Sequence, residues 1–247
     1  MWPPRLCARS SRVPRPWTVL RHGPVEGLEP NLWVVTSALP RGSLDRRMSV
    51  VQLSDGRLVF HNAVPLEEPA MTAIERHGEV AFLVVPTRLH RLDVHAWKER
   101  YPRCRVLAPP GSARAVARAV ALDGGLDLLP RDPALEIELL DGTGRREAVL
   151  AVRSPRGTSL LFGDALMKVP RRGGLGGALL GLIGSSGGPR VTALARLWLV
   201  DDRRALGAHL VRLAATPGLL RLVPTHGPVV DRDPSGVLRA EGERLLR

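Results

Sequence analysis

The amino-acid sequence predicts an α/β protein in which two mixed β-sheets lie face to face with helices outside, a four-layer αββα sandwich. The first observation is the order of elements, because predicted strands alternate with predicted helices along the chain. The second is length: 247 residues fit one large two-sheet domain, and no break in composition suggests a second one. The third is that three apolar strands each lead to a side chain that can bind a metal.

The three strand ends share one plan. An apolar run beginning at Leu160 reaches Asp164, a second beginning at Leu222 reaches His226, and a third beginning at Phe82 leads to a turn that carries His90. Because strand ends meet at the edge of a sheet, the plan indicates one shared site on that edge. Taken alone, an acid in this position also fits a residue that caps the turn after a strand.

The first half of the chain is predicted from apolar patterns that alternate with turn residues. Asp55-Gly56 has the composition of a hairpin turn, and Gly78 ends a helix. The predicted strands are Leu32–Thr36, Met48–Leu53, Arg57–His61, Val80–Val85 and Arg105–Ala108. The predicted helices are Glu67–Arg76, Asp93–Arg100 and Ser112–Val120.

The second half supplies the other sheet and two longer helices. The predicted strands are Leu126–Leu129, Glu136–Leu140, Ala148–Arg153 and Leu219–Val223, besides the strand that leads to Asp164. The predicted helices are Asp202–Ala214 and Pro234–Leu246. A Gly-rich apolar segment, residues 173–188, is too short and too rich in glycine to span a bilayer. A mobile flap over the site is the preferred interpretation, and a membrane-surface patch or a homodimer contact are the alternatives.

The amino-terminal residues differ in composition from the rest. Residues 1–25 hold five arginines, five prolines and no acid, within a chain of net charge +12. We therefore expect a basic arm over residues 1–27, disordered rather than bound to phosphate, before a domain at residues 28–247. No apolar signal-peptide core is present, which favours the cytoplasm. Cys7 and Cys104 form neither a zinc pattern nor a disulfide framework.

The succession of these motifs resembles the metallo-β-lactamase fold superfamily. It consists of a strand with a His-bearing turn, then a strand ending in Gly163-Asp164, then a strand ending in His226-Gly227. The resemblance covers roughly residues 30 to 230 and implies the αββα fold. It also implies that Asp164 is the family's bridging aspartate and His226 its last histidine ligand. The similarity is nearest to an uncharacterised branch whose metal motif is eroded.

The turn after the third strand carries only part of the family motif, His-x-His-x-Asp-His. In the favoured register Arg88 stands at the first His, His90 at the second and Asp93 at the third. In the other register His90 and His95 stand at the first and third His. In both registers at least two of the four ligands are missing.

Two further positions depart from the family pattern. Where catalytic members carry a supporting Asp after an early strand, this chain has His61-Asn62. Where they carry a His before the strand to Gly-Asp, it has Arg153, whose guanidinium stays protonated and cannot bind a metal. Arg88 and Arg153 would bring fixed positive charge to vacated ligand positions, which favours a small anion.

What remains allows at most one ion. The favoured register leaves Asp93, Asp164 and His226 as ligands, a set for which Mn²⁺ or Fe²⁺ competes with Zn²⁺. The other register replaces Asp93 with His95, which suits Fe²⁺ or Zn²⁺. A site that holds no metal is the remaining alternative. We expect no pair of metal ions and no turnover of β-lactams or simple esters.

Three hypotheses for the function follow. The first is an atypical metallohydrolase of unknown substrate that uses one ion. The second is a non-catalytic member that binds a small anionic ligand or a partner through Arg88 and Arg153. The third is a nucleic-acid hydrolase, which the few aromatic residues and the lack of room for an additional domain disfavour. Apart from the metal ligands, the sequence identifies no catalytic residue.

Overall fold

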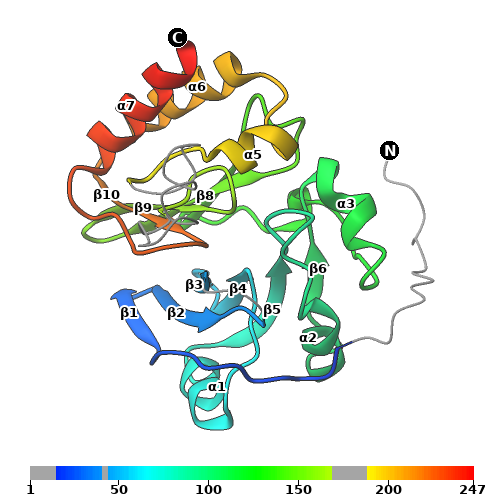
Figure 1. Cartoon of the computed structure of the whole chain (residues 1–247). Coiled ribbons are helices and arrows are strands. Elements are labelled where there is room, and N and C mark those ends of the chain that lie inside the picture. The colour runs from blue at the N-terminus through cyan, green and yellow to red at the C-terminus, as the bar shows by residue number, and fades with distance from the viewer. Residues whose placement is uncertain (1–14, 41–43, 169–187) are drawn as a thin grey trace. The chain divides into compact units, whose positions relative to one another are not determined.

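The computed structural model describes residues 15–40, 44–168 and 188–247 (Figure 1). Contacts divide the chain into two compact units, residues 1–137 and 138–247. A six-stranded sheet belongs to the first unit and a four-stranded sheet to the second, with the boundary inside one strand of the latter. The first fourteen residues of the predicted arm and residues 173–187 of the Gly-rich segment lie outside the described residues, so the predictions made for them stay predictions.

The six-stranded sheet of the first unit has the order β1-β2-β3-β4-β5-β6. Its strands are β1 (Glu26–Glu29), β2 (Leu32–Ala38), β3 (Asp45–Gln52), β4 (Arg57–His61), β5 (Glu79–Val84) and β6 (Arg105–Leu107). The first four are antiparallel neighbours, whereas β4, β5 and β6 are parallel, so the sheet is mixed as predicted. The predicted hairpin turn joins β3 to β4, and its Gly56 has a left-handed φ of 83°.

Three short helices cover the core of this unit: α1 (Glu68–Glu75), α2 (Val94–Arg100) and α3 (Pro110–Val116). The core joins apolar side chains of β3, β4 and β5 to Trp97 of α2. The prediction of a strand at Leu126–Leu129 is wrong, because Leu126–Leu128 forms a 3₁₀ helix. This run lacks the β-branched residues that favour a ladder, and it is bounded by Gly125 and Pro130.

The four-stranded sheet of the second unit has the order β10-β9-β8-β7. Its strands are β7 (Leu135–Leu139), β8 (Ala148–Ser154), β9 (Gly157–Phe162) and β10 (Leu219–Pro224). Strand β9 is antiparallel to β8 and parallel to β10, so this sheet is also mixed. That one parallel pairing brings the carboxyl ends of β9 and β10 to the same edge.

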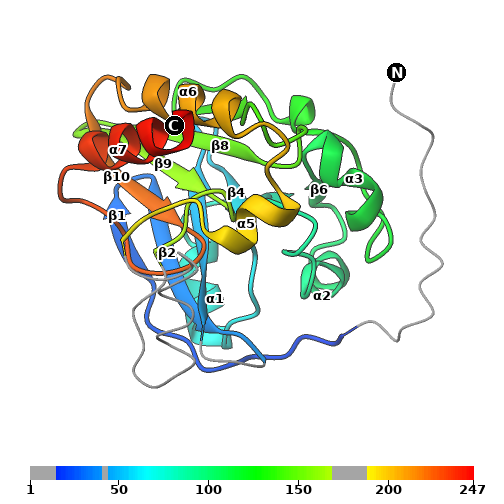
Figure 2. The same ribbon diagram turned by 45° about the horizontal axis from the view of Figure 1, so that its top comes forward.

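Among its described residues the second unit has the helices α5 (Ala193–Trp198), α6 (Arg203–Leu213) and α7 (Pro234–Leu246), of which α5 was not predicted. All three contribute to one core with β8, β9 and β10. Helices α6 and α7 lie side by side, where Gly207 and Gly242 let the two backbones approach (Figure 2). Among the described residues, no helix is long and apolar enough to cross a bilayer.

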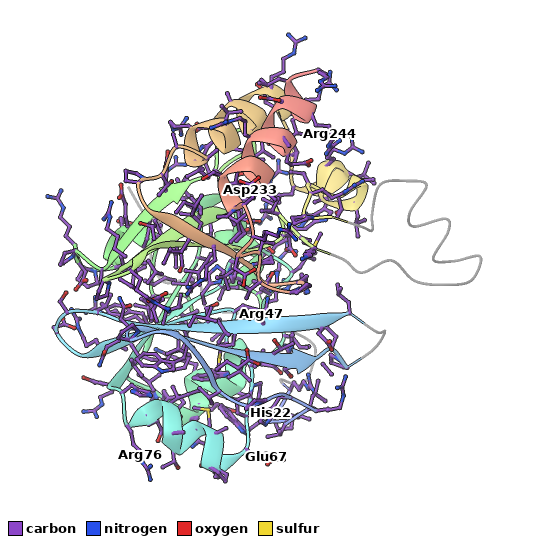
Figure 3. All side chains as sticks on the ribbon, turned by 90° about the vertical axis from the view of Figure 1, so that its left-hand side faces the viewer. His22, Arg47, Glu67, Arg76, Asp233 and Arg244 are labelled. Carbon is purple, nitrogen blue, oxygen red and sulfur yellow. The ribbon has the colours of Figure 1, made fainter. Side chains whose placement is uncertain are left out.

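Part of the predicted arm is packed on the first unit. The indole of Trp17 contacts the core, donates a hydrogen bond to the Leu66 carbonyl at 3.1 Å and lies 5.2 Å from the ring of Trp97. His22 Nε2 accepts a 3.4 Å hydrogen bond from the Glu67 backbone N–H, and Figure 3 shows the two residues together. Residues of the predicted arm from Arg15 onward therefore contact the first unit, and the boundary at residue 27 stays a prediction.

Candidate metal centre

Asp164 and His226 meet in the second unit because of strand register. Phe162 and Pro224 are the last registered pair of the parallel strands β9 and β10. Asp164 and His226 each lie two residues beyond that pair, so their side chains leave the sheet edge at the same level. The His226 Nε2 atom lies 3.5 Å from Asp164 Oδ1, and both side chains are buried. The predicted meeting of these two strand ends is observed.

The two turns are also joined by hydrogen bonds to their backbone carbonyl groups. Thr225 donates a hydrogen bond from Oγ1 to the Gly163 carbonyl at 2.7 Å, across the gap between the strand ends. The Lys168 N–H donates to the His226 carbonyl at 3.1 Å. Gly227 follows with a φ of 94°, and a Cβ there would lie 1.9 Å from the Lys168 carbonyl oxygen. The Gly after His226 is therefore required by both conformation and space.

Glu147 stabilises the turn at Asp164 through hydrogen bonds, a role that was not predicted from the sequence. Its buried carboxylate accepts hydrogen bonds from three consecutive backbone N–H groups, those of Gly163 at 2.8 Å, Asp164 at 2.8 Å and Ala165 at 2.9 Å. Burial raises the pKa of Glu147 to about 8, with repulsion from Asp164 as the next cause, while the three N–H donors act in the opposite direction. The position of this acid, immediately before the apolar strand β8, was the one feature of the sequence that could have indicated its role.

His90 belongs to the first unit and is oriented by Asn62. The Asn62 Nδ2 donates to the Arg47 carbonyl at 2.8 Å, which turns its Oδ1 toward His90. His90 Nδ1 lies 2.8 Å from that oxygen, and an amide oxygen only accepts, so Nδ1 carries the hydrogen. The lone pair is therefore on Nε2, the form of histidine that binds a metal. Asn62 thus supports a ligand candidate at the position where catalytic members carry a supporting Asp.

The backbone also favours this arrangement. Asn62 has a left-handed φ of 59°, which Asn tolerates better than most residues, and its N–H donates to the Val84 carbonyl at 3.1 Å. The His90 N–H donates to the Thr87 carbonyl at 3.1 Å, which closes the turn after β5. Both residues are therefore fixed at the carboxyl ends of parallel neighbouring strands, β4 and β5.

Asp93, one of the predicted metal ligands, takes part in two ion pairs. Its Oδ2 lies 2.5 Å from Arg46 Nη1, and its Oδ1 lies 3.2 Å from Arg15 Nη1. Arg46 shares a face of β3 with Met48 and Val50, which belong to the core under the helices. Asp93 therefore faces this core, and two guanidinium groups already neutralise it. We do not retain it as a ligand.

The other predicted site residues have different surroundings. His95 lies on α2, and its Nδ1 is 3.4 Å from Glu99 Oε2, one turn along the same helix. Arg88 is exposed. Arg153 pairs in register with Thr158 at the start of β9, whereas Asp164 follows the end of that strand. The part of β8 that lies at the level of Asp164 is its beginning, next to Glu147, and the anion-binding role of Arg88 and Arg153 stays a prediction.

His90, Asp164 and His226 offer donor atoms that could hold a metal ion. Two imidazoles and one carboxylate suit Zn²⁺ or Fe²⁺. The hydrogen-bonded Nδ1 of His90 is an independent sign that this set fits a metal, because ligating histidines donate their other N–H to an oxygen in this way.

Comparison with solved structures identifies the fold. The chain is similar to the DIM-1 metallo-β-lactamase exposed to ceftazidime, with a TM-score of 0.60, 14% identity and coverage of 92% of this chain and 98% of that one. A second similar structure is the FIM-1 metallo-β-lactamase from Pseudomonas aeruginosa in its mono-zinc form, with a TM-score of 0.56, 14% identity and coverage of 90% and 96%. A third is a metallo-β-lactamase from Pontibacter korlensis, with a TM-score of 0.59, 15% identity and coverage of 89% and 98%.

These likenesses span nearly the whole chain and confirm the predicted fold class, an α/β sandwich of two mixed sheets. No protein-family model and no curated protein matches the sequence. At 14–15% identity the solved structures establish the fold and leave the chemistry to the residues of the site.

Proposed function

We propose that this protein, which has the metallo-β-lactamase fold, is a metal-dependent hydrolase that uses one divalent ion held by His90, Asp164 and His226. The observation that carries the proposal is the hydrogen bond between His90 Nδ1 and Asn62 Oδ1, at 2.8 Å. It fixes the tautomer that a metal ligand needs. A histidine with a purely structural role has no need of this fixed acceptor nitrogen.

The second support comes from the pair in the other unit. Asp164 and His226 are buried and lie 3.5 Å apart at their nearest atoms. A cation bound between the two side chains would be attracted by the Asp164 carboxylate and could accept the lone pair of the imidazole. With two neutral imidazoles and one carboxylate, the complete set would leave an ion with net positive charge.

That positive charge fits hydrolysis. A bound divalent ion supplies a Lewis acid and lowers the pKa of a coordinated water toward neutrality. His90 contributes Nε2 from a ring whose orientation Asn62 fixes, and Asp164 contributes a carboxylate on a turn that Glu147 fixes. Three protein ligands leave a coordination position for water or substrate.

We propose one ion rather than two because the described residues lack ligands for a second. A second ion would also need about three protein ligands. Asp93 forms ion pairs with two arginines, and Arg153 of β8 lies beside the start of β9, whereas Asp164 follows its end. The mono-zinc form of FIM-1 shows that a similar fold can hold a single ion. The predicted absence of β-lactam and simple ester turnover stays a prediction.

Isothermal titration of the full chain with Zn²⁺, Mn²⁺ and Fe²⁺ tests the proposal, with Asp164→Asn as the site variant. Asp231→Asn is the matched control, because Asp231 is an exposed acid of the same unit. We expect one tight equivalent in the wild type and in the control, and none in Asp164→Asn. Two tight equivalents would contradict the single-ion site, and none in the wild type would contradict metal binding altogether.

The hydrolytic part needs its own measurement. The metal-loaded wild type and Asp164→Asn are compared on a panel of phosphodiester, thioester, lactone and amide substrates. We expect turnover of at least one class by the wild type, lost on chelation and in the variant. A protein that binds its ion and hydrolyses none of these classes would favour the non-catalytic hypothesis.

A further inference from the structure

We propose that Glu147 is a positioning residue for the metal ligand Asp164. Its carboxylate fills a concave group of three backbone N–H donors, from Gly163, Asp164 and Ala165, and so holds the turn in the conformation that directs Asp164 toward His226. The expected effect of Glu147 on metal binding rests on the proposed function. Its expected effect on the conformation of the turn rests only on the hydrogen bonds.

The contacts explain how one side chain can fix the turn. Oε1 accepts from Gly163, and Oε2 accepts from both Asp164 and Ala165, with distances of 2.8, 2.8 and 2.9 Å. Three successive N–H groups converge on one acceptor only when the backbone dihedral angles of the turn are defined. Without Glu147 these buried donors would be unsatisfied, and the turn would rearrange to find other acceptors.

Charge distinguishes this role from ordinary structural support. Glu147 is completely buried, and the nearby Asp164 carboxylate repels it. A Gln side chain has one acceptor oxygen and could accept from only part of these donors, whereas the carboxylate accepts at both oxygens and brings a second negative charge next to a ligand candidate. The second charge becomes favourable when a cation is bound at Asp164, because it adds to the attraction for that cation. The arrangement therefore favours the metal-bound form over the empty form.

The chain offers a matched control in Glu241 of α7. This carboxylate is also buried and accepts a backbone N–H, that of Val191, at 2.7 Å. It pairs with Arg244 on its own helix rather than with any ligand candidate. A change to Gln at either position removes a buried carboxylate from the same unit, and only the change at Glu147 alters the Asp164 turn.

The experiment compares Glu147→Gln with Glu241→Gln in the full chain, by titration with Zn²⁺ and by hydrogen exchange of the amides of residues 163–165. We expect Glu147→Gln to weaken Zn²⁺ binding by about 10–100-fold and to speed exchange at these amides. Glu241→Gln should lower thermal stability and leave both readouts at wild-type values. If Glu147→Gln does not fold, Glu147→Asp keeps the charge with a shorter reach and should show the same changes to a smaller degree.

The outcomes separate this inference from the proposed function. Wild-type Zn²⁺ affinity in Glu147→Gln, with binding abolished in Asp164→Asn, overturns the role of Glu147 and leaves the metal site standing. If the wild type binds no Zn²⁺, the proposed function fails, and the hydrogen-exchange experiment alone tests the role of Glu147 in the turn. Faster exchange of the amides of residues 163–165 in Glu147→Gln, but not in Glu241→Gln, then supports that role. Unchanged exchange of these amides in Glu147→Gln refutes it.

Discussion

Asp164 and His226 lie 3.5 Å apart because each follows, by two residues, the last registered pair of two parallel strands. A slip of that register by one residue would turn one of the two side chains to the other side of the sheet. The hydrogen bond from Thr225 to Gly163 ties the strand ends together at this point. Local backbone geometry, rather than long side chains, therefore makes this half of the site.

The first prediction concerns the turn after His226. We expect Gly227→Ala to destabilise the fold and to weaken Zn²⁺ binding. Its φ of 94° costs a non-glycine residue about 1–2 kcal/mol, and its Cβ would clash with the Lys168 carbonyl, at 1.9 Å. Because Lys168 bonds the His226 carbonyl, relief of the clash displaces the ligand. Urea unfolding and titration with Zn²⁺ measure the two effects.

Gly56→Ala is the matched control for that prediction. Gly56 has a similar φ of 83°, and an added Cβ there would meet nothing within 4 Å. Gly56→Ala should therefore lose the stability that a left-handed φ costs a non-glycine residue. It should have no steric clash and no change in Zn²⁺ affinity. Equal losses of stability and equal Zn²⁺ affinities in the two variants would show that the approach of Lys168 does not matter.

The second prediction concerns the residue that orients His90. Asn62→Gly removes the amide and tolerates the left-handed φ of 59°, so backbone strain does not confuse the result. We expect Zn²⁺ affinity to fall by about 10–100-fold, as when other hydrogen-bond partners of metal ligands are lost. Asn62→Asp keeps an acceptor for His90 Nδ1 and should retain most of the affinity. Equal affinities in the glycine variant and the wild type would show that Asn62 does not support a ligand.

The sequence was sufficient for most of the fold. The order of strands and helices followed from apolar periodicity and turn residues, and β4 and α7 have their predicted bounds. The exceptions are short, and they include β1, which was not predicted. Leu126–Leu128 and α5 are brief apolar segments in which periodicity cannot separate helix from strand.

The site was predicted only in part, for a physical reason. Asp164, His226 and His90 stand at strand ends, where sequence position determines the place of a side chain in the fold. For Arg153, the sequence did not show which end of β8 lies beside the end of β9, because that depends on the register of the hairpin between the two strands. Glu147 was missed since its partners are backbone N–H groups, which leave no side-chain pattern in the sequence.

The third prediction revises the expectation for the amino-terminal arm. The arm over residues 1–27 was predicted to be disordered, but Trp17 contacts the core, and its ring lies 5.2 Å from the Trp97 ring and 4.7 Å from the Arg100 guanidinium carbon. We therefore expect Trp17→Ala to lower the free energy of unfolding by about 1–3 kcal/mol. The change Thr18→Ala, at the neighbouring position, should have little effect. A wild-type melting temperature for Trp17→Ala would restore the original expectation.

The last prediction is a pH dependence of stability without metal. Burial raises the pKa of Glu147 from 4.5 to about 8, so the folded chain binds this proton more tightly than the unfolded chain. The resulting stabilisation is complete below about pH 4.5 and is lost as the pH rises through about 8. Other groups also titrate in this range, so the wild-type curve alone does not isolate the contribution of Glu147.

The variant Glu147→Gln isolates the contribution of Glu147 to the pH dependence, because the amide side chain cannot ionise. Urea unfolding is measured from about pH 5 to about pH 8.5 in the presence of a chelator, for the wild type, Glu147→Gln and the Glu241→Gln control. The fall in unfolding free energy with rising pH should be steeper in the wild type than in Glu147→Gln, and as steep in Glu241→Gln as in the wild type. Parallel curves for the wild type and Glu147→Gln would mean that Glu147 is already ionised across this range, and that the three N–H donors outweigh the effect of burial on its pKa.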